Sequence, residues 1–275
     1  MMRTLDLRTR VALLLIVGIA AAAAVALHAP ISQSAAYHAF ADQRTISSVP
    51  NFWNVISNVP FLLIGLAGIW TLARRNPNGT VATLRPVYYC VFAGVALVAF
   101  GSAYYHLAPS NAALTWDRLP MTIAFMALFA LVIGEHIDPR LGLHLLPPLL
   151  VIGVGSVLYW HITQSAGHGD LRPYLMVQFL PLLLVPLILL LFPSRLTGVG
   201  YLWALIAAYA VAKLLEAADA VVFAYGHVLS GHTLKHLTAG FGMYLLLLAI
   251  TRRRPVIAAT TVIESTPQIT DAKAQ

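Results

Sequence analysis

Long apolar segments alternate with short polar breaks along most of the chain. Eight segments are apolar over about 20 residues, the length that a helix needs to cross the hydrocarbon core of a bilayer. They are 11–28, 52–73, 86–106, 112–134, 142–161, 173–192, 199–223 and 231–251. Proline, glycine or charge marks most of the breaks, as at Pro109, Asp138-Pro139 and Pro193. The pattern predicts eight membrane-spanning helices joined by short loops.

The composition agrees with this prediction. Of the 275 residues, 59% are hydrophobic and only 10% are charged, whereas a soluble domain carries about 25% charged residues. So few polar residues cannot cover a water-facing surface. The fold class is therefore an all-α polytopic membrane protein, which excludes a soluble enzyme, a disordered chain and a secreted disulfide scaffold. Cys90 is the only cysteine and cannot form an intramolecular disulfide.

The chain divides into three parts. Residues 1–30 form an N-terminal hydrophobic helix or signal anchor, 31–254 a seven-helix membrane domain, and 255–275 a polar tail that we expect to be disordered and cytoplasmic. Three arginines precede the apolar stretch Val11 to Leu27, as in a signal peptide. The first helix can therefore be retained or cleaved, and either outcome leaves the other seven spans in the same orientation.

The positive charges indicate the orientation. The excess of 17 Lys and Arg over 10 Asp and Glu is distributed between apolar segments, so it does not form the basic face of a nucleic-acid-binding protein. With the N-terminus inside, the inner loops contain Arg74, Arg75 and the run 252–254, whereas the outer loops contain only Arg44 and Arg172. The positive-inside rule thus predicts that both ends are cytoplasmic.

Three groups of polar residues lie in predicted spans, where ionisable side chains are costly and often functional. Ser102 and His106 are four residues apart near the end of the third span, so they share a helix face. Asp117 lies near the start of the fourth span, and His232 and His236 open the last span with the same spacing of four. All three groups lie on the predicted outer, non-cytoplasmic side.

These residues suggest a metal hydrolase. Two imidazoles four residues apart and a third from another helix leave one tetrahedral position for water, as in catalytic zinc sites. Asp117 could accept a proton from that water and Ser102 could hydrogen-bond the developing oxyanion.

Other interpretations of the same residues stay open. The histidines could serve in helix packing alone, or they could bind haem. Ser102 could hydrogen-bond to the backbone of its own helix, and Asp117 could form an ion pair with Arg118. Ser102, His106 and Asp117 could also form a Ser–His–Asp triad.

The motifs resemble those of the alkaline ceramidases. Residues 51–58, NFWNVISN, are similar to the EFWNTVSN opening of the first core helix in that family. Ser102 to His106, then Asp117 eleven residues later, and His232 with His236 follow the family pattern S-x-x-x-H, D and H-x-x-x-H over most of residues 40–251. The family belongs to a superfamily of seven-helix membrane hydrolases that includes adiponectin-type receptors.

The resemblance implies a zinc ion on His106, His232 and His236, with Ser102 and Asp117 assisting amide hydrolysis of ceramide to sphingosine and fatty acid. The implied partner is a ceramide-like membrane lipid. Alternatives are a lipid-ester-cleaving enzyme, or a receptor-like member with a different lipid ligand and a structural zinc that needs a fourth protein ligand.

The chain departs from the family near its N-terminus. Eukaryotic alkaline ceramidases have an acidic calcium site before and at the start of the first core helix. Here Asn51 stands where the motif has Glu, and Asp42 is the only acid between His28 and Asn51. Calcium dependence is therefore doubtful. The additional N-terminal span is a second departure.

Further charges lie in the seventh predicted span. Lys213 and Glu216 are three residues apart and can form an ion pair within one helix. Asp219 could orient an imidazole that ligates the metal.

Overall fold

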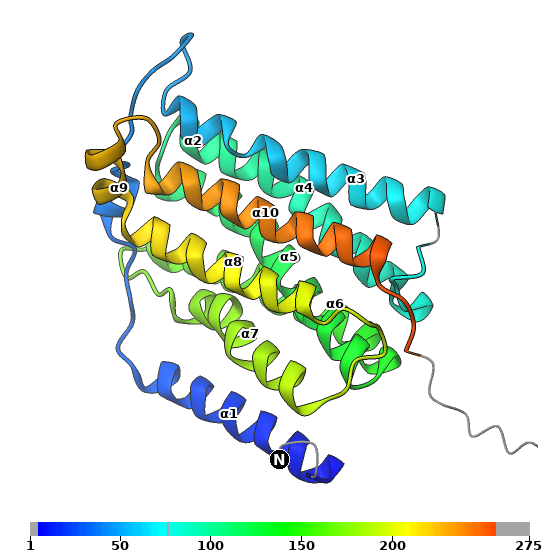
Figure 1. Ribbon diagram of the computed structural model, residues 1–275. Coiled ribbons are helices and arrows are strands. Elements are labelled where there is room, and N and C mark those ends of the chain that lie inside the picture. The colour runs from blue at the N-terminus through cyan, green and yellow to red at the C-terminus, as the bar shows by residue number, and fades with distance from the viewer. Residues whose placement is uncertain (1–4, 76, 257–275) are drawn as a thin grey trace, which may run out of the picture.

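The computed structural model of the chain describes residues 5–75 and 77–256, and the long elements within these ranges are all helices (Figure 1). In chain order they are α1 (Leu7–Leu27), η2 (Ala35–His38), α2 (Phe52–Ile56), α3 (Val59–Arg75), η3 (Ala82–Leu84), α4 (Arg85–Leu107), α5 (Asn111–His136), α6 (Pro139–Ser165), α7 (Arg172–Leu191), α8 (Gly200–Ala217), α9 (Asp219–Gly226) and α10 (Gly231–Arg252). The predicted disordered tail lies outside the described residues from 257 onwards.

Eight helical segments of the described chain are long and apolar enough to cross a membrane. Many of their large apolar side chains point outward, where lipid rather than water would contact them; Leu63, Phe100 and Ile152 are each more than half exposed. The predicted fold class, an all-α polytopic membrane protein, is confirmed.

Seven of these spans pack into one bundle. The helices α3, α4, α5 and α6 contact one another in chain order, α7 packs on α5 and α6, and α10 lies between α3 and α8 (Figure 1). The helix α1 has no buried residue and lies at the edge of the bundle against α7. The seven-helix core with one additional N-terminal helix therefore matches the sequence prediction.

Local sequence explains where several helices begin. Pro139 and Pro173 lie in the first turns of α6 and α7, where no partner is needed for the missing backbone N–H. The side chains of Ser110, Asp138 and Ser230 precede α5, α6 and α10 and accept hydrogen bonds from backbone N–H groups in the first turn of each helix.

The sequence predicts one continuous span over 199–223, and this prediction is wrong after Ala217. The helix ends there, and the chain continues as the short helix α9. The carboxylate of Asp219 accepts hydrogen bonds from the backbone N–H of His232 at 2.6 Å and of Ala41 at 2.9 Å. These partners come from distant parts of the chain, so the hydropathy of the segment could not indicate the break.

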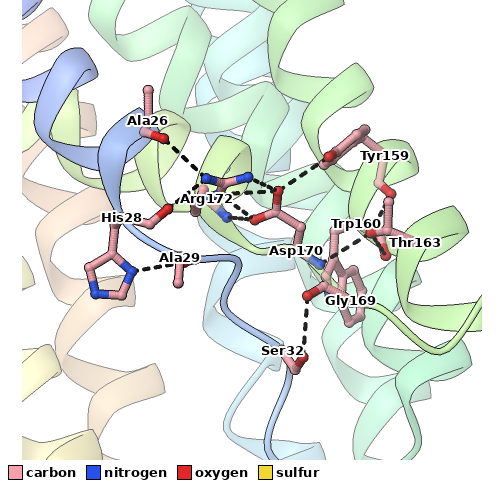
Figure 2. A network of polar contacts seen from close by, with 10 residues as sticks. All are labelled: Ala26, His28, Ala29, Ser32, Tyr159, Trp160, Thr163, Gly169, Asp170 and Arg172. Carbon is pink, nitrogen blue, oxygen red and sulfur yellow. Dashed lines mark hydrogen bonds and ion pairs between the residues drawn. The ribbon is translucent and has the colours of Figure 1, made fainter.

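The C-terminal end of α1 is attached to the core by Arg172, the first residue of α7 (Figure 2). Its guanidinium donates to the carbonyl oxygens of Ala26 and His28 at 3.1 and 2.6 Å. The same group binds both carboxylate oxygens of Asp170 and lowers the pKa of that carboxyl to about 2. The ion pair therefore persists at neutral and mildly acidic pH.

A buried ion pair ties together the opposite end of the bundle. The Arg253 guanidinium donates to both oxygens of Glu135 at 2.7 and 2.8 Å, and both side chains are almost fully buried. The Tyr88 hydroxyl also donates to Glu135. Arg253 is thus a core residue, whereas the charge pattern alone places it among the loop cations.

We expect Glu135→Gln to lower the free energy of unfolding by about 3–5 kcal/mol, because it leaves the Arg253 charge buried without a counter-ion. Titration of detergent-purified protein with a denaturing detergent measures this loss. The double variant Glu135→Leu/Arg253→Met, which removes both charges, should recover most of it. Equal stability of Glu135→Gln and the unsubstituted protein would contradict this account of the core.

Candidate metal centre

Three histidines meet at one end of the bundle. His106 lies in the last turn of α4, and His232 and His236 lie in the first two turns of α10. Their side chains are buried, and one nitrogen of each lies within 4.8 Å of the others. In the part of the chain that the structure describes, this is the only group of three or more His, Cys, Asp or Glu side chains with such an arrangement.

The closest two nitrogens of this cluster have the spacing of ligands on a tetrahedral cation. The Nε2 atoms of His106 and His232 face each other at 3.3 Å. Two nitrogens that each lie about 2.0–2.1 Å from a tetrahedral zinc are about 3.3 Å apart. At neutral pH two imidazole nitrogens at this distance share at most one hydrogen, so a cation would satisfy both lone pairs.

The third imidazole is oriented by a hydroxyl group. Ser57, at the break between α2 and α3, places its Oγ 2.8 Å from His236 Nδ1 and 3.2 Å from the carbonyl oxygen of Asn54. If the hydroxyl donates to that carbonyl, its oxygen accepts the Nδ1–H of His236. The Nε2 lone pair is then free to bind a metal.

Contacts from other elements fix the ends of the two helices that present the histidines. The side chain of Asn51, in a left-handed conformation with φ of 48°, donates to the His106 carbonyl oxygen at 2.8 Å. Gly231 allows α10 to approach α8, because a Cβ atom there would lie 2.2 Å from the Leu215 carbonyl oxygen. The Phe40 ring covers His106 and His232, with centroids 4.7 Å from each.

Asp219 positions α10 in a different way from the predicted one. Its carboxylate binds the backbone N–H of His232, as described above, rather than an imidazole. The interpretation that it orients a metal-ligating ring is therefore wrong, although it does hold the turn that presents His232.

Ser102 and Asp117 lie together beside the histidines. Gly101 brings α4 against α5, because a Cβ atom there would lie 2.1 Å from the Trp116 carbonyl oxygen. Ser102, the next residue of α4, and Asp117, the next residue of α5, therefore lie on neighbouring helices at this point of close contact. The structure thus brings all five sequence-predicted site residues to one end of the bundle.

A cavity of about 330 Å³ opens beside this group, between α4, α5, α7, α8 and α10. The polar side chains of its lining include His236, Ser102, Asp117, Arg118 and Lys235. The remaining lining is mostly apolar and includes Phe125, Leu128, Phe179, Leu205 and Met243. The cavity therefore combines a polar end with space for a hydrocarbon chain.

Glu216 forms two ion pairs at the rim of the cavity. It pairs with Lys213 within α8, as the sequence predicts, and also with Lys235 of α10. The hydroxyl of Tyr37 donates to the same carboxylate at 3.3 Å. The second ion pair joins residues that are far apart in sequence, so the sequence could not indicate it.

The alternative interpretations find little support in the structure. Among the described residues no ion pair joins Asp117 to Arg118 and no hydrogen bond joins Ser102 to His106, as a triad requires. The three imidazole centroids lie 4.8–5.0 Å apart, which leaves no room for a haem between them. No fourth ligating residue of the described chain joins the cluster, as a closed structural site would need.

The residues near the N-terminal side of α2 do not fit a calcium site. The Asp42 carboxylate is bound by the Arg44 side chain at 2.7 and 2.8 Å, which lowers the pKa of Asp42. Asn51 uses its side-chain N–H for the His106 carbonyl. A carboxylate neutralised by arginine is a poor ligand for Ca²⁺, which prefers several anionic oxygens.

Sequence reasoning missed the side chains that support the ligands. Ser57 contacts His236, and Asn54 Oδ1 accepts a hydrogen bond from Thr233 Oγ1 at 2.8 Å, so both join the start of α10 to the segment before α3. The one sequence signal for these two residues is that they lie in the segment 51–58, NFWNVISN, which resembles the EFWNTVSN opening of the first core helix in alkaline ceramidases. Phe40 had no signal in the sequence, because its role depends on a loop that folds over the histidines.

Comparison with known proteins gives an independent result. The chain matches the family model described as Ceramidase over residues 42–180. This range includes Ser102, His106 and Asp117, while the fold brings His232 and His236 from outside it. A comparison with curated proteins finds no match. Because the family model covers half of the chain, the protein belongs to the ceramidase family, whose members are hydrolases that act on the amide bond of ceramide.

Proposed function

We propose that this protein is a zinc-dependent intramembrane amidohydrolase that cleaves ceramide-like lipids to a sphingoid base and a fatty acid. One observation carries the proposal: three buried imidazoles adjoin a cavity that also contains Ser102 and Asp117. Membership of the ceramidase family supports the proposal that an amide bond is cleaved.

His106, His232 and His236 would hold the zinc ion. Three neutral nitrogen ligands with a free fourth position are the arrangement of catalytic zinc sites. A zinc ion there would polarise the substrate carbonyl and lower the pKa of bound water to about 7.

The side chains of the cavity would carry out the proton transfers. Water adds to the amide carbonyl carbon, and Asp117 accepts its proton. Ser102 donates a hydrogen bond to the carbonyl oxygen as negative charge develops there. Asp117 then returns the proton to the nitrogen as the carbon–nitrogen bond breaks, which releases the amine and the fatty acid.

The apolar part of the cavity would hold a hydrocarbon chain. A second small apolar cavity lies between α5, α7 and α8 and shares Phe125, Leu128 and Tyr209 with the main one. We infer that the lipid enters from the bilayer on this side of the bundle. The site would face the non-cytoplasmic side, because Arg74 and Arg75 lie at the opposite end of α3 from Ser57.

The first prediction concerns the metal. Purified protein should contain about one equivalent of zinc, and His236→Ala should lose it because two imidazoles hold the ion much less tightly. Metal analysis by mass spectrometry measures the content, with the exposed His168→Ala as a control that keeps it. A full equivalent of zinc in His236→Ala would show that this ligand set is wrong.

A second prediction concerns Ser57, which contacts His236 without belonging to the cluster. Ser57→Ala removes the hydrogen bond that orients this imidazole, and the loss of such a partner typically costs 10–100-fold in metal affinity. Competition with a zinc chelator of known affinity measures the change. Unchanged affinity would mean that Ser57 has no role in holding the metal, and Ser57→Thr, which keeps a hydroxyl, should retain most of the affinity.

A third prediction concerns Asp117. Asp117→Asn keeps the size of the side chain but removes its ability to accept a proton, so turnover of ceramide should fall about 10²–10⁴-fold with zinc still bound. Product analysis by mass spectrometry, with metal content measured in parallel, tests this. Asp138→Asn, at the other end of the bundle, is the matched control. A loss of less than threefold in Asp117→Asn would remove Asp117 from the catalytic group.

A further inference from the structure

Arg118 is a buried cation on the wall of the cavity. It follows Asp117 on α5 and its side chain is only 5% exposed. Nη2 donates to the Gln33 side-chain oxygen at 2.6 Å. Nη1 is buried and has no hydrogen-bond partner among the described residues. A guanidinium with an unused donor is therefore available beside the reactive groups.

The ion pairs among the described charges that line the cavity do not include Arg118. Lys213 and Lys235 both pair with Glu216. Arg118 takes part in none of the ion pairs within the described residues. The remaining carboxylate of the cavity, that of Asp117, forms no ion pair with Arg118 within the described residues. The charged side chains that line the cavity are thus three cations, Arg118, Lys213 and Lys235, and two carboxylates, Asp117 and Glu216, which leaves a surplus of positive charge.

Aromatic rings hold the guanidinium in place without neutralising it. Its carbon lies 4.2 Å from the ring centroid of Trp160, 4.6 Å from that of Tyr174 and 5.8 Å from that of Tyr37. Such rings attract the cation through their faces and leave its N–H groups free to donate. A fixed, planar guanidinium of this kind matches the oxygens of a carboxylate or a phosphate.

We propose that Arg118 selects lipid amides whose head group carries an anionic oxygen group, a carboxylate or a phosphate, near the amide. This inference rests on the proposed function, which supplies the amide hydrolysis. The anion would accept a hydrogen bond from Nη1 and supply the missing counter-charge. A neutral ceramide offers only hydroxyl oxygens at the same place, and these compensate the buried charge less well.

Hydrolysis of three substrates by the purified full-length protein tests the proposal: ceramide, ceramide 1-phosphate, and N-palmitoylserine, whose head group is a carboxylate. We expect a kcat/KM for at least one anionic substrate about 10–100-fold above that for ceramide, the factor contributed by one hydrogen bond to a charged group. The substrate preferred shows whether the anion is a phosphate or a carboxylate.

Variants separate recognition from a structural role. Arg118→Gln should abolish the preference for the anionic substrate, mainly through KM, and Arg118→Lys should restore part of it. Arg74→Gln, which removes an exposed cation at the far end of α3, should leave the preference unchanged. If Arg118 only held Gln33 and the aromatic rings, its substitution would lower stability and slow all three substrates equally, which would overturn the proposal.

A binding measurement distinguishes failure of this inference from failure of the proposed function. Hexadecyl phosphate should raise the thermal unfolding temperature more than hexadecanol does, and Arg118→Gln should remove the difference. This result without any amide hydrolysis would contradict the proposed reaction but support the anion site. Hydrolysis of ceramide with no preference for either anionic substrate, and equal effects of the two ligands, would refute the anion site alone.

Discussion

Three neutral imidazoles buried at one point are the constraint on which the rest of this end of the protein depends. Their ring nitrogens converge in an apolar bundle, where polar atoms without partners are costly and a shared cation would satisfy them. His106 comes from the end of α4 and the other two from the start of α10, so the ends of both helices must be held in position. Much of the surrounding polar structure serves this need: Asn51 binds the last turn of α4, and Asp219 binds the first turn of α10.

The cavity next to the histidines joins two environments that a lipid amidase requires. Its apolar part has space for a hydrocarbon chain, and Ser102 and Asp117 line its polar part, where the proposed function puts the amide bond. The close contact of α4 and α5 at Gly101 places these two residues side by side. Arg118, one residue further along α5, also lines the cavity, so the proposed reaction and the proposed recognition would be neighbouring functions of one helix turn.

The sequence predicts those features that depend on local pattern. Apolar length indicates the spans, and spacing of four residues places Ser102 with His106, and His232 with His236, on common helix faces. Features that depend on distant contacts could not be predicted. The break after Ala217 and the burial of Arg253 both require partners more than ten residues away in the chain. Charge and hydropathy patterns contain no information about such partners.

The account stands on the three histidines as metal ligands, and X-ray absorption spectroscopy of the purified protein at the zinc edge tests this most directly. The account predicts a four-coordinate ion with three imidazole nitrogens at about 2.0–2.1 Å and one further oxygen ligand. A sulfur ligand, a fourth protein ligand in place of the oxygen, or protein that binds no zinc at all would contradict it.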